Sequence, residues 1–146
     1  MTDLHTARLH LPLLAPGQAQ KELTHNEALT LVDILTNPVV ENATTAVPPP
    51  NPGSDQSWLV APDAAGAWAG QSSRIAAFTV GGWRFVSPYE GMIVWDKATG
   101  KQRRFHSGQW ITPNNFTLPS GGTVVDQEAR AAIGNVAALL ANWGLA

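Results

Sequence analysis

The sequence predicts a mainly β member of the α+β class, with one helix near each end of the chain. Three observations support this class. Apolar residues recur with a period of about 3.6 residues before residue 37 and again after residue 125. Between residues 57 and 112, short apolar runs alternate with turn residues. A chain of 146 residues has room for one well-packed core.

Residues 1–41 are expected to form an extended arm followed by a helix. Prolines and a glycine interrupt the first 17 residues, which prevents a continuous helix there. The string THNE at residues 24–27 fits a capping box, so we expect a helix from about Thr24 to Thr36. The pair Asn37-Pro38 supplies a stop signal. Residues 18–23 could form a helical turn that precedes this helix.

Two further segments follow. Residues 42–56 are rich in proline in a polar background, which favours an extended linker and marks the clearest boundary in the chain. Residues 57–113 are expected to form a tryptophan-rich, antiparallel β module with about six short strands up to Thr112. Gly81-Gly82 is expected to form a tight hairpin turn within it.

An internal repeat supports this register of strands. The pattern Phe78-x-x-Gly81-x-Trp83 recurs as Phe105-x-x-Gly108-x-Trp110, shifted by 27 residues at all three positions. Each copy follows a predicted strand that carries Trp58 or Trp95. The sequence therefore predicts a small β module made of two repeated units.

Residues 114–146 are expected to form a loop and then an amphipathic helix. Asp126 is a suitable N-cap, and Gly144 suits the C-terminal stop. The apolar residues of this helix are spaced 4, 3, 4, 3 and form a narrow seam: Ala129, Ile133, Val136, Leu140 and Trp143. Such a seam predicts association with other copies, whereas packing back on the sheet requires the same spacing and stays open.

Several classes of chemistry are not expected. The chain has no cysteine, a net charge of -2 and no clustered basic stripe, so we expect neither thiolate chemistry nor a nucleic-acid partner. The histidines show no metal-ligand spacing, and nucleotide-binding and serine-nucleophile motifs are missing. We therefore expect no metal, no cofactor, no catalytic residue and no enzyme. Paired carboxylates could still converge in a glycan hydrolase, which is the third hypothesis; the candidates are Asp55, Asp63, Glu90 and Asp96.

Tryptophan is the residue type that exceeds its usual frequency. Exposed indole rings stack on sugars, and arginine forks bind hydroxyl groups or carboxylates, so the β module contains candidate carbohydrate ligands. These are Trp83, Trp95, Trp110, Arg103 and Arg104. In so small a module most of the rings are expected in the core, and ligand contact is the alternative reading for each of them.

The string LPLLAPGQAQKELTHNEAL resembles an uncharacterised domain family of alphaproteobacterial prophages and gene transfer agents, found in tail-fibre and head-spike proteins. The likeness continues through PPPNPG, SWLVAPDAAGAWAG, IAAFTVGGWRFVSPYEGMIVWD and FHSGQW, and covers roughly residues 8–112. The resemblance implies a structural particle protein with a part in attachment to a bacterial surface, through envelope polysaccharide. It implies no catalytic residues.

Together these observations predict a non-enzymatic spike or fibre base, or an adaptor, within a phage-like particle. A homo-oligomer is expected, with a trimer favoured, and other particle proteins are the expected partners. The second hypothesis is a carbohydrate-binding module that acts directly in adsorption to cell-surface polysaccharide. The apolar residues near the N-terminus form no run long enough for a secretory leader or a membrane span, so we expect synthesis and assembly in the cytoplasm.

Overall fold

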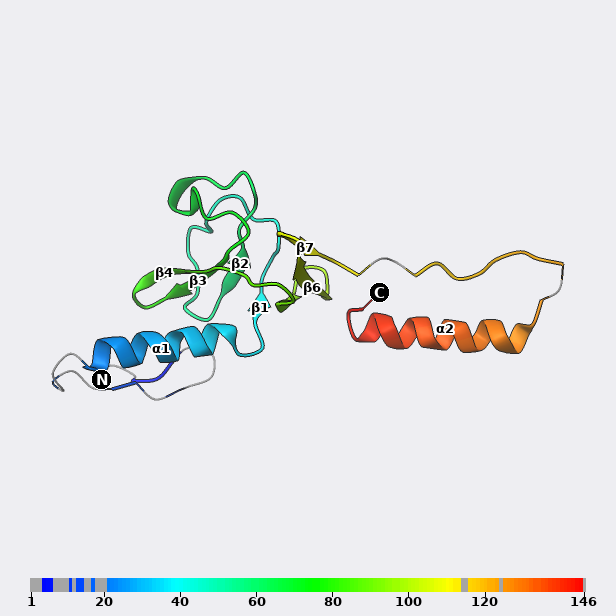
Figure 1. Cartoon of the computed structure of the whole chain (residues 1–146), viewed down its shortest axis with the longest axis horizontal. Helices are drawn as coiled ribbons and strands as arrows, with labels where there is room; N and C mark the ends of the chain where they lie inside the picture. Colours follow the sequence, from blue (N-terminus) through cyan, green and yellow to red (C-terminus); the bar gives the residue numbers. More distant parts are fainter. Residues whose placement is uncertain are drawn as a thin grey trace.

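The computed structural model describes residues 4–6, 11, 13, 14, 17, 21–113, 116–123 and 125–145. Within this part of the chain the elements are α1 Lys21–Leu35, β1 Val39–Val40, β2 Ser57–Leu59, the 3-10 turn η1 Gly66–Trp68, β3 Ile75–Thr79, β4 Gly82–Val86, β5 Ile93–Asp96, β6 Lys101–His106, β7 Gln109–Ile111 and α2 Gln127–Asn142. The protein is α+β and mainly β, as predicted. Figure 1 shows α1 and α2 at opposite ends of the strands.

The strands form two sheets, which correspond to the two predicted units. One sheet has the order β2-β3-β4, and the other has the order β1-β5-β6-β7. Both β2-β3-β4 and β5-β6-β7 are antiparallel meanders. The expectation of six strands between residues 57 and 112 is therefore confirmed. The short strand β1, which pairs in parallel with β5, was not predicted.

The repeated Phe and Trp positions are cross-strand pairs in two hairpins. Phe78 lies opposite Trp83, and Phe105 lies opposite Trp110. In both pairs the rings meet edge to face, with centroids 5.0 Å and 5.3 Å apart. This geometry is favourable for aromatic rings and fixes the register of each hairpin. The shared sequence pattern thus encodes the same local structure twice.

The two hairpin turns lie at equivalent positions but differ in conformation, since positive φ occurs at both turn residues in the second hairpin and at neither in the first. Ser107 and Gly108 both have positive φ, at 49° and 82°, as a tight type I′ turn requires. In the first hairpin, Thr79 lies opposite Gly82, so the turn consists of Val80 and Gly81. The expectation of a Gly81-Gly82 turn was therefore wrong by one position, because Gly82 already belongs to β4 with a φ of 94°.

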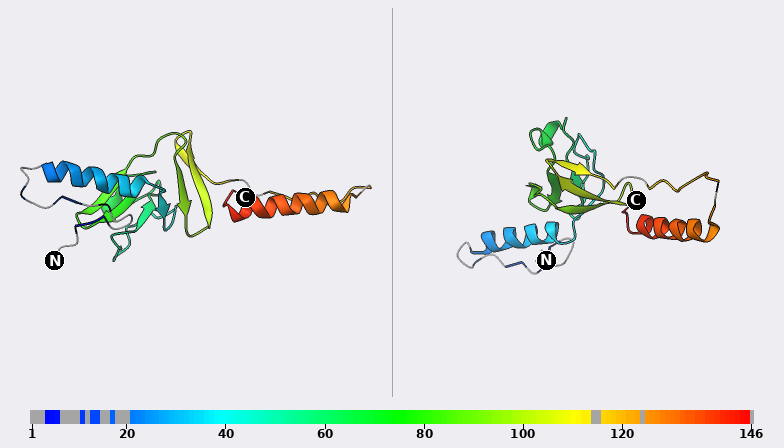
Figure 2. Two further views of the ribbon diagram at one scale, coloured as in Figure 1. Left: turned by 90° about the horizontal axis from the view of Figure 1, so that it is seen from below. Right: turned by 45° about the vertical axis from the view of Figure 1, so that its right-hand side comes forward.

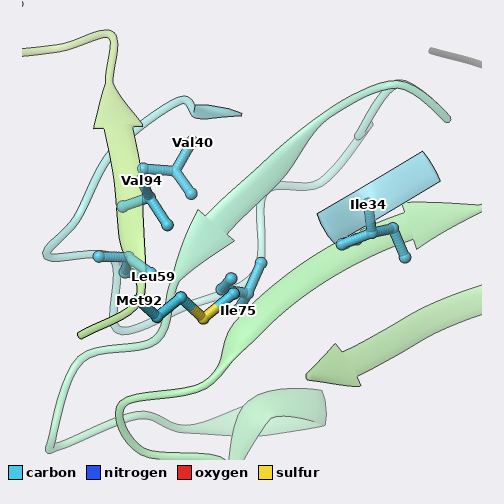
Figure 3. Packing of buried hydrophobic residues seen from close by; sticks show 7 residues of the cluster. Ile34, Val40, Leu59, Ile75, Met92 and Val94 are labelled. Atoms are coloured by element: carbon cyan, nitrogen blue, oxygen red, sulfur yellow. The ribbon is translucent and has the colours of Figure 1, made fainter. Parts of the chain in front are cut away.

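The largest core cluster lies between the two sheets and α1. Its buried members are Ile34, Val40, Leu59, Ile75, Ala77, Met92 and Val94. Figure 3 shows Val40 beside Val94 and Met92 beside Leu59, so that residues from both sheets meet. Ile34 joins this cluster from the last turn of α1. The cluster therefore holds the first helix and both predicted units together.

A second core cluster consists mainly of tryptophan. Trp68, on η1, is fully buried, and its ring centroid lies 6.1 Å from that of Trp58 and 5.0 Å from that of Trp83. Trp58 and Trp83 also meet edge to face. This cluster covers the face of β2-β3-β4 that points away from α1, because Trp58 and Ala76 alternate with core residues of the first cluster along their strands. These rings form core, as expected for a small module.

The first helix begins earlier than predicted. It contains Lys21 as its first described residue, so Thr24 lies inside the helix, and the predicted capping box was wrong. Glu27 instead accepts a hydrogen bond from Nε of Arg84 on β4 at 3.0 Å. The Asn26 side chain bonds both backbone groups of Leu14 and so fixes this part of the arm against α1. Residues 21–23 of the predicted preceding turn are helical, whereas residues 18–20 and most of the predicted arm lie outside the described residues.

The proline-rich segment 42–56 contains neither helix nor strand, but its first part is attached to the chain around β2. The backbone N–H of Leu59 donates to the carbonyl of Asn42, and the N–H of Ala61 donates to the carbonyl of Thr45, each at 3.0 Å. Thr45 also forms an isolated parallel bridge with Val60. The first part of the segment therefore runs beside the end of β2, and the segment leads the chain from β1 into the first meander.

The second helix has the predicted ends but packs on neither sheet. The Asp126 carboxylate accepts from the backbone N–H of Ala129 at 2.9 Å, and Gly144 has a φ of 67°. None of the helix residues is buried. Figure 2 shows that α2 projects from the end of the molecule where β6 and β7 lie. Of the two arrangements that the sequence left open, coverage of the sheet is not the one adopted by the single chain.

Candidate functional site

The apolar side of α2 is the clearest unpartnered surface in the described part of the chain. Val136 is 56% exposed, Leu139 is 58% exposed and Trp143 is 67% exposed. Ile133 and Leu140 are also exposed large apolar residues, and Ala129 is exposed. The predicted seam thus lies on one side of the helix and is broadened by Leu139, whose place beside it the heptad spacing did not indicate.

A helix of this length is marginal on its own in water. Forming the first turn is costly, and most helical stability in proteins comes from packing of an apolar side. In α2 that packing is missing along the whole span Gln127–Asn142 within the single chain. The helix therefore gains stability from any partner that covers Val136 and its apolar neighbours.

The linker before α2 follows the helix rather than the sheets. The Arg130 guanidinium donates to the carbonyl of Pro119 at 2.9 Å and also to the carbonyl of Gly121. The described residues from 116 to 123 are exposed. The linker and α2 therefore form one protruding unit, visible on the right of Figure 1.

The residues that follow α2 contact the β module. The carbonyl of Gly144 accepts from the backbone N–H of Gln102 on β6 at 3.0 Å, and the carbonyl of Trp143 accepts from Nε2 of Gln102 at 3.2 Å. Gly144 is buried there, close to the ring of Trp95. We call the surface formed by Gln102 on β6 and Trp95 on β5, which receives Trp143–Leu145, the tail seat.

The five predicted carbohydrate ligands do not share one surface. Residues directly opposite one another in a sheet lie on the same face, and successive residues alternate. By this register Trp110 and Arg103 lie on the inner face of β5-β6-β7, with the buried Val94. Trp95 and Arg104 lie on the outer face with Ile93 and Ile111. Trp83 belongs to the other sheet.

Most of these five side chains make internal contacts. Trp83 is part of the tryptophan cluster, and Nε1 of Trp110 donates to the carbonyl of Ser73 at 2.8 Å. Arg103 donates to the buried carboxylate of Asp96 at 2.7 Å. Trp95 lies at the tail seat. Arg104 is exposed and lines a small cavity of about 210 Å³ beside Leu145.

A larger cavity of about 270 Å³ lies between α1, the arm and the first hairpin. Carboxylates of Glu27, Asp33 and Asp55 line it together with Arg84. Sequence reasoning missed this cavity because its walls come from segments that are far apart in the chain. Glu27 and Arg84 pair with each other across it, and Asp33 also has an interaction partner. Of its charged lining groups, Glu27, Arg84 and Asp33 thus already have interactions within the chain.

Another candidate carboxylate, Glu90, is paired at the second hairpin. Its Oε1 lies 2.5 Å from Nδ1 of His106, and its Oε2 accepts from the backbone N–H of Ser107 at 3.0 Å. The hydrogen bond from His106 and then that from Ser107 lower the pKa of Glu90. The Ser107 hydroxyl lies 3.4 Å from Nε2 of His106. The side chains of Glu90 and His106 are more than half exposed, so this cluster braces a turn at the surface.

Other features bear on partners. Among the described residues, no cluster of three or more histidine or acidic side chains could hold a metal ion. None of the helices within the described ranges has the length and hydropathy needed to cross a membrane.

The comparisons with known proteins identify a family. A search of curated proteins finds no match. A family model described as protein of unknown function (DUF2793) matches residues 25–111, which is more than half of the chain. The match begins within α1 and ends with β7, so it covers the proline-rich segment and both meanders and stops before the α2 unit. The chain belongs to the DUF2793 family of proteins of unknown function.

Proposed function

We propose that the protein is a non-enzymatic structural component of a phage-like particle or gene transfer agent, a spike or fibre base or an adaptor that supports attachment to the bacterial surface. The observation that carries the proposal is the apolar side of α2, which has no partner within the described chain. The sequence resemblance to tail-fibre and head-spike proteins supports the place of this component in a particle.

The exposed seam favours assembly of identical chains. Ile133, Val136 and Leu140 follow the spacing that places apolar residues along a helix-to-helix contact. Closed symmetric association covers such a seam on every copy at once, which leaves no apolar surface for uncontrolled growth. We propose a trimer, the stoichiometry expected from the resemblance to tail-fibre and head-spike proteins.

The carbohydrate-binding alternative gains no support from the placement of its residues. A sugar-binding surface needs several exposed rings or polar groups that converge on one ligand. Trp83 and Trp110 instead pack in the two clusters, and Trp95 forms part of the tail seat. We therefore propose that the aromatic residues of the β module serve mainly the rigidity of the scaffold.

Light scattering on the full chain tests the assembly. We expect a concentration-dependent oligomer, and we expect Val136→Glu or Leu140→Glu to shift the mass to that of the monomer, because each places a charge in the seam. Ala131→Glu and Ala138→Glu are matched controls with the same added charge on the opposite side of α2, where both alanines are exposed. These controls should keep the oligomer. A full chain that stays monomeric at high concentration contradicts the proposal.

Purification of particles from a producing bacterium tests the location. We expect a tagged full chain to co-sediment with particles through a density gradient, in a fixed ratio to the other particle proteins. The Val136→Glu variant should be missing from the particles, whereas the Ala138→Glu variant should be retained. Absence of the unmodified chain from purified particles excludes the structural role.

A further inference from the structure

We propose that the α2 unit is exchanged between copies, so that the Trp143–Leu145 tail of one chain occupies the tail seat on β6 of a second chain. This inference rests on the proposed assembly and names the occupant of the seat. It assigns to Trp95, Gln102 and Gly144 a role in holding the oligomer together rather than in binding a ligand.

The seat is an open sheet edge of defined length. Strand β7 pairs with β6 only from Arg104 to His106. If the same register continued, Pro113 would lie opposite Gln102, and the chain has already left the sheet at that point. The N–H of Gln102 would then remain open, but the carbonyl of Gly144 accepts from it. The tail therefore covers an edge that β7 leaves exposed, in the manner of an added strand.

The seat is selective for glycine. A Cβ atom at position 144 would lie 2.6 Å from Cζ3 of Trp95 and 3.0 Å from the backbone nitrogen of Gln102. The first distance is shorter than Cβ contacts in proteins and the second is tight against backbone, and the φ of 67° adds strain for any other residue. The close fit ties the orientation of α2 to the sheet, although none of the α2 residues is buried.

The linker allows either chain to supply the tail. Between β7 and α2 the described residues form no helix or strand, and 116–123 are exposed. The linker comprises residues 112–126. At about 3.3 Å per residue when extended, it can span more than the roughly 24 Å length of the sixteen-residue helix α2. The single chain already uses this reach, because the linker runs outward beside α2 and the helix then leads back to the strands (Figure 2). The same reach allows α2 to extend away from its own β module toward that of a second chain.

Exchange keeps every contact of the seat and adds others. The hydrogen bonds from Gln102 and the contact with Trp95 are the same whether the tail comes from the same chain or from a second one. Crossing of the linkers brings several copies of α2 together, so that the exposed side around Val136 becomes covered. Because the seat contacts are equal in both arrangements, the burial of the apolar side of α2 is what favours exchange over the single-chain arrangement.

The absence of cysteine in the chain allows a direct test. Ile111 and Leu145 line the same small cavity at the seat. The variant carrying both Ile111→Cys and Leu145→Cys is assembled and treated with a short bismaleimide, and the products are separated under denaturing conditions. Exchange predicts covalent dimers and higher oligomers that make up most of the cross-linked product. A cross-linked product that consists of single chains overturns the exchange.

Two controls separate this inference from the assembly itself. Light scattering of the double-cysteine variant before cross-linking must show the oligomer; if it does and only single chains are cross-linked, the assembly stands and the exchange is wrong. Gly144→Val blocks the seat, and Gly144→Ala tests the fit with the smallest added side chain. Under exchange, Gly144→Val lowers the oligomer mass as strongly as Val136→Glu does. An unchanged mass and unchanged cross-linking in Gly144→Val also overturn the proposal.

Discussion

Helices α1 and α2 have similar lengths and similar amphipathic patterns, yet α1 packs on the β module and α2 has no buried residue. Helix α1 buries Asp33 and Ile34 against the β module and pairs Glu27 with Arg84 on β4. Helix α2 buries none of its residues. It has a complete N-cap at Asp126, so its local signals are as good as those of α1 or better.

The difference shows that helix signals and helix partners are separate properties of a sequence. Caps and periodicity decide where a helix forms, whereas long-range contacts decide what covers it. Ile34 of α1 enters a core that the same chain supplies, and Val136 of α2 has no such core. The first helix thus belongs to the fold, and we expect the second to belong to the assembly.

The largest contrast is expected from one truncation in each helix. Ile34→Ala should lower the free energy of unfolding of the β module by about 2–5 kcal/mol, because it leaves a cavity among buried residues. Ile133→Ala in α2 should change it by less than about 0.5 kcal/mol in the monomer, since the side chain is exposed there. Urea denaturation, followed by fluorescence of the buried tryptophans, measures both. Equal effects of the two changes would show that α2 packs on the β module after all.

A smaller effect is expected from the cap of α2. Asp126→Ala removes the acceptor for the backbone N–H of Ala129 and should cost about 1 kcal/mol of helix stability. Because α2 has no tertiary support in the monomer, this loss should appear as reduced helical circular dichroism at low protein concentration. Asp126→Asn keeps an acceptor and should retain most of the signal. If Asp126→Ala leaves the helical signal intact, a partner already holds α2.

The ion pair of α1 with the sheet should contribute less. Glu27 and Arg84 are both partly exposed, and pairs of this kind contribute about 0.2–1 kcal/mol. A double-mutant cycle with Glu27→Gln and Arg84→Gln, read by urea denaturation, should give a coupling energy at the lower end of that range. The coupling should weaken further in high salt. A coupling above this range would mean that the pair, rather than Ile34, positions α1.

The smallest expected effect is a pH dependence confined to the β module. The pKa of Glu90 is lowered in the folded chain by its bonds with His106 and Ser107, so the ionised form favours the fold. This stabilisation is present above the ordinary glutamate pKa and is lost as the pH falls through the lowered value. Thermal melting between neutral and acidic pH should show a slight loss that Glu90→Gln abolishes. The helical signal of α2 at low concentration should not share it.

Local features of the fold could be predicted from the sequence. The six strands, the repeated Phe and Trp pairs, Asp126 as N-cap and Gly144 as stop all depend on neighbouring residues. The start of α1 could not be predicted, because Thr24 and Glu27 have the spacing of a capping box although both lie inside the helix. What Glu27 contacts is Arg84, which is far away in the chain. No local pattern records such a pair.

For the candidate site, too, the sequence predicted local patterns but not long-range contacts. The apolar seam of α2 follows from the spacing of Ile133, Val136 and Leu140, and its exposure does not. The grouping of Trp95 with Trp110 as ligands failed to anticipate that the two rings point to opposite faces of one sheet. Faces depend on strand register, which the turn positions determine, and a turn placed one residue off reverses every side chain of a strand.

The parallel pairing of β1 with β5 has a consequence for the order of events during synthesis. Val39 and Val40 find their partners only when Trp95 and Asp96 have emerged from the ribosome, and the first meander lies between them in the sequence. The β2-β3-β4 meander can form early from local contacts, and α1 can pack on it through Ile34, whereas β1 has no partner strand until β5 is made. A nascent chain stalled before residue 93 should therefore expose Val40 to chaperones, and release of β5 should end that exposure in one cooperative step.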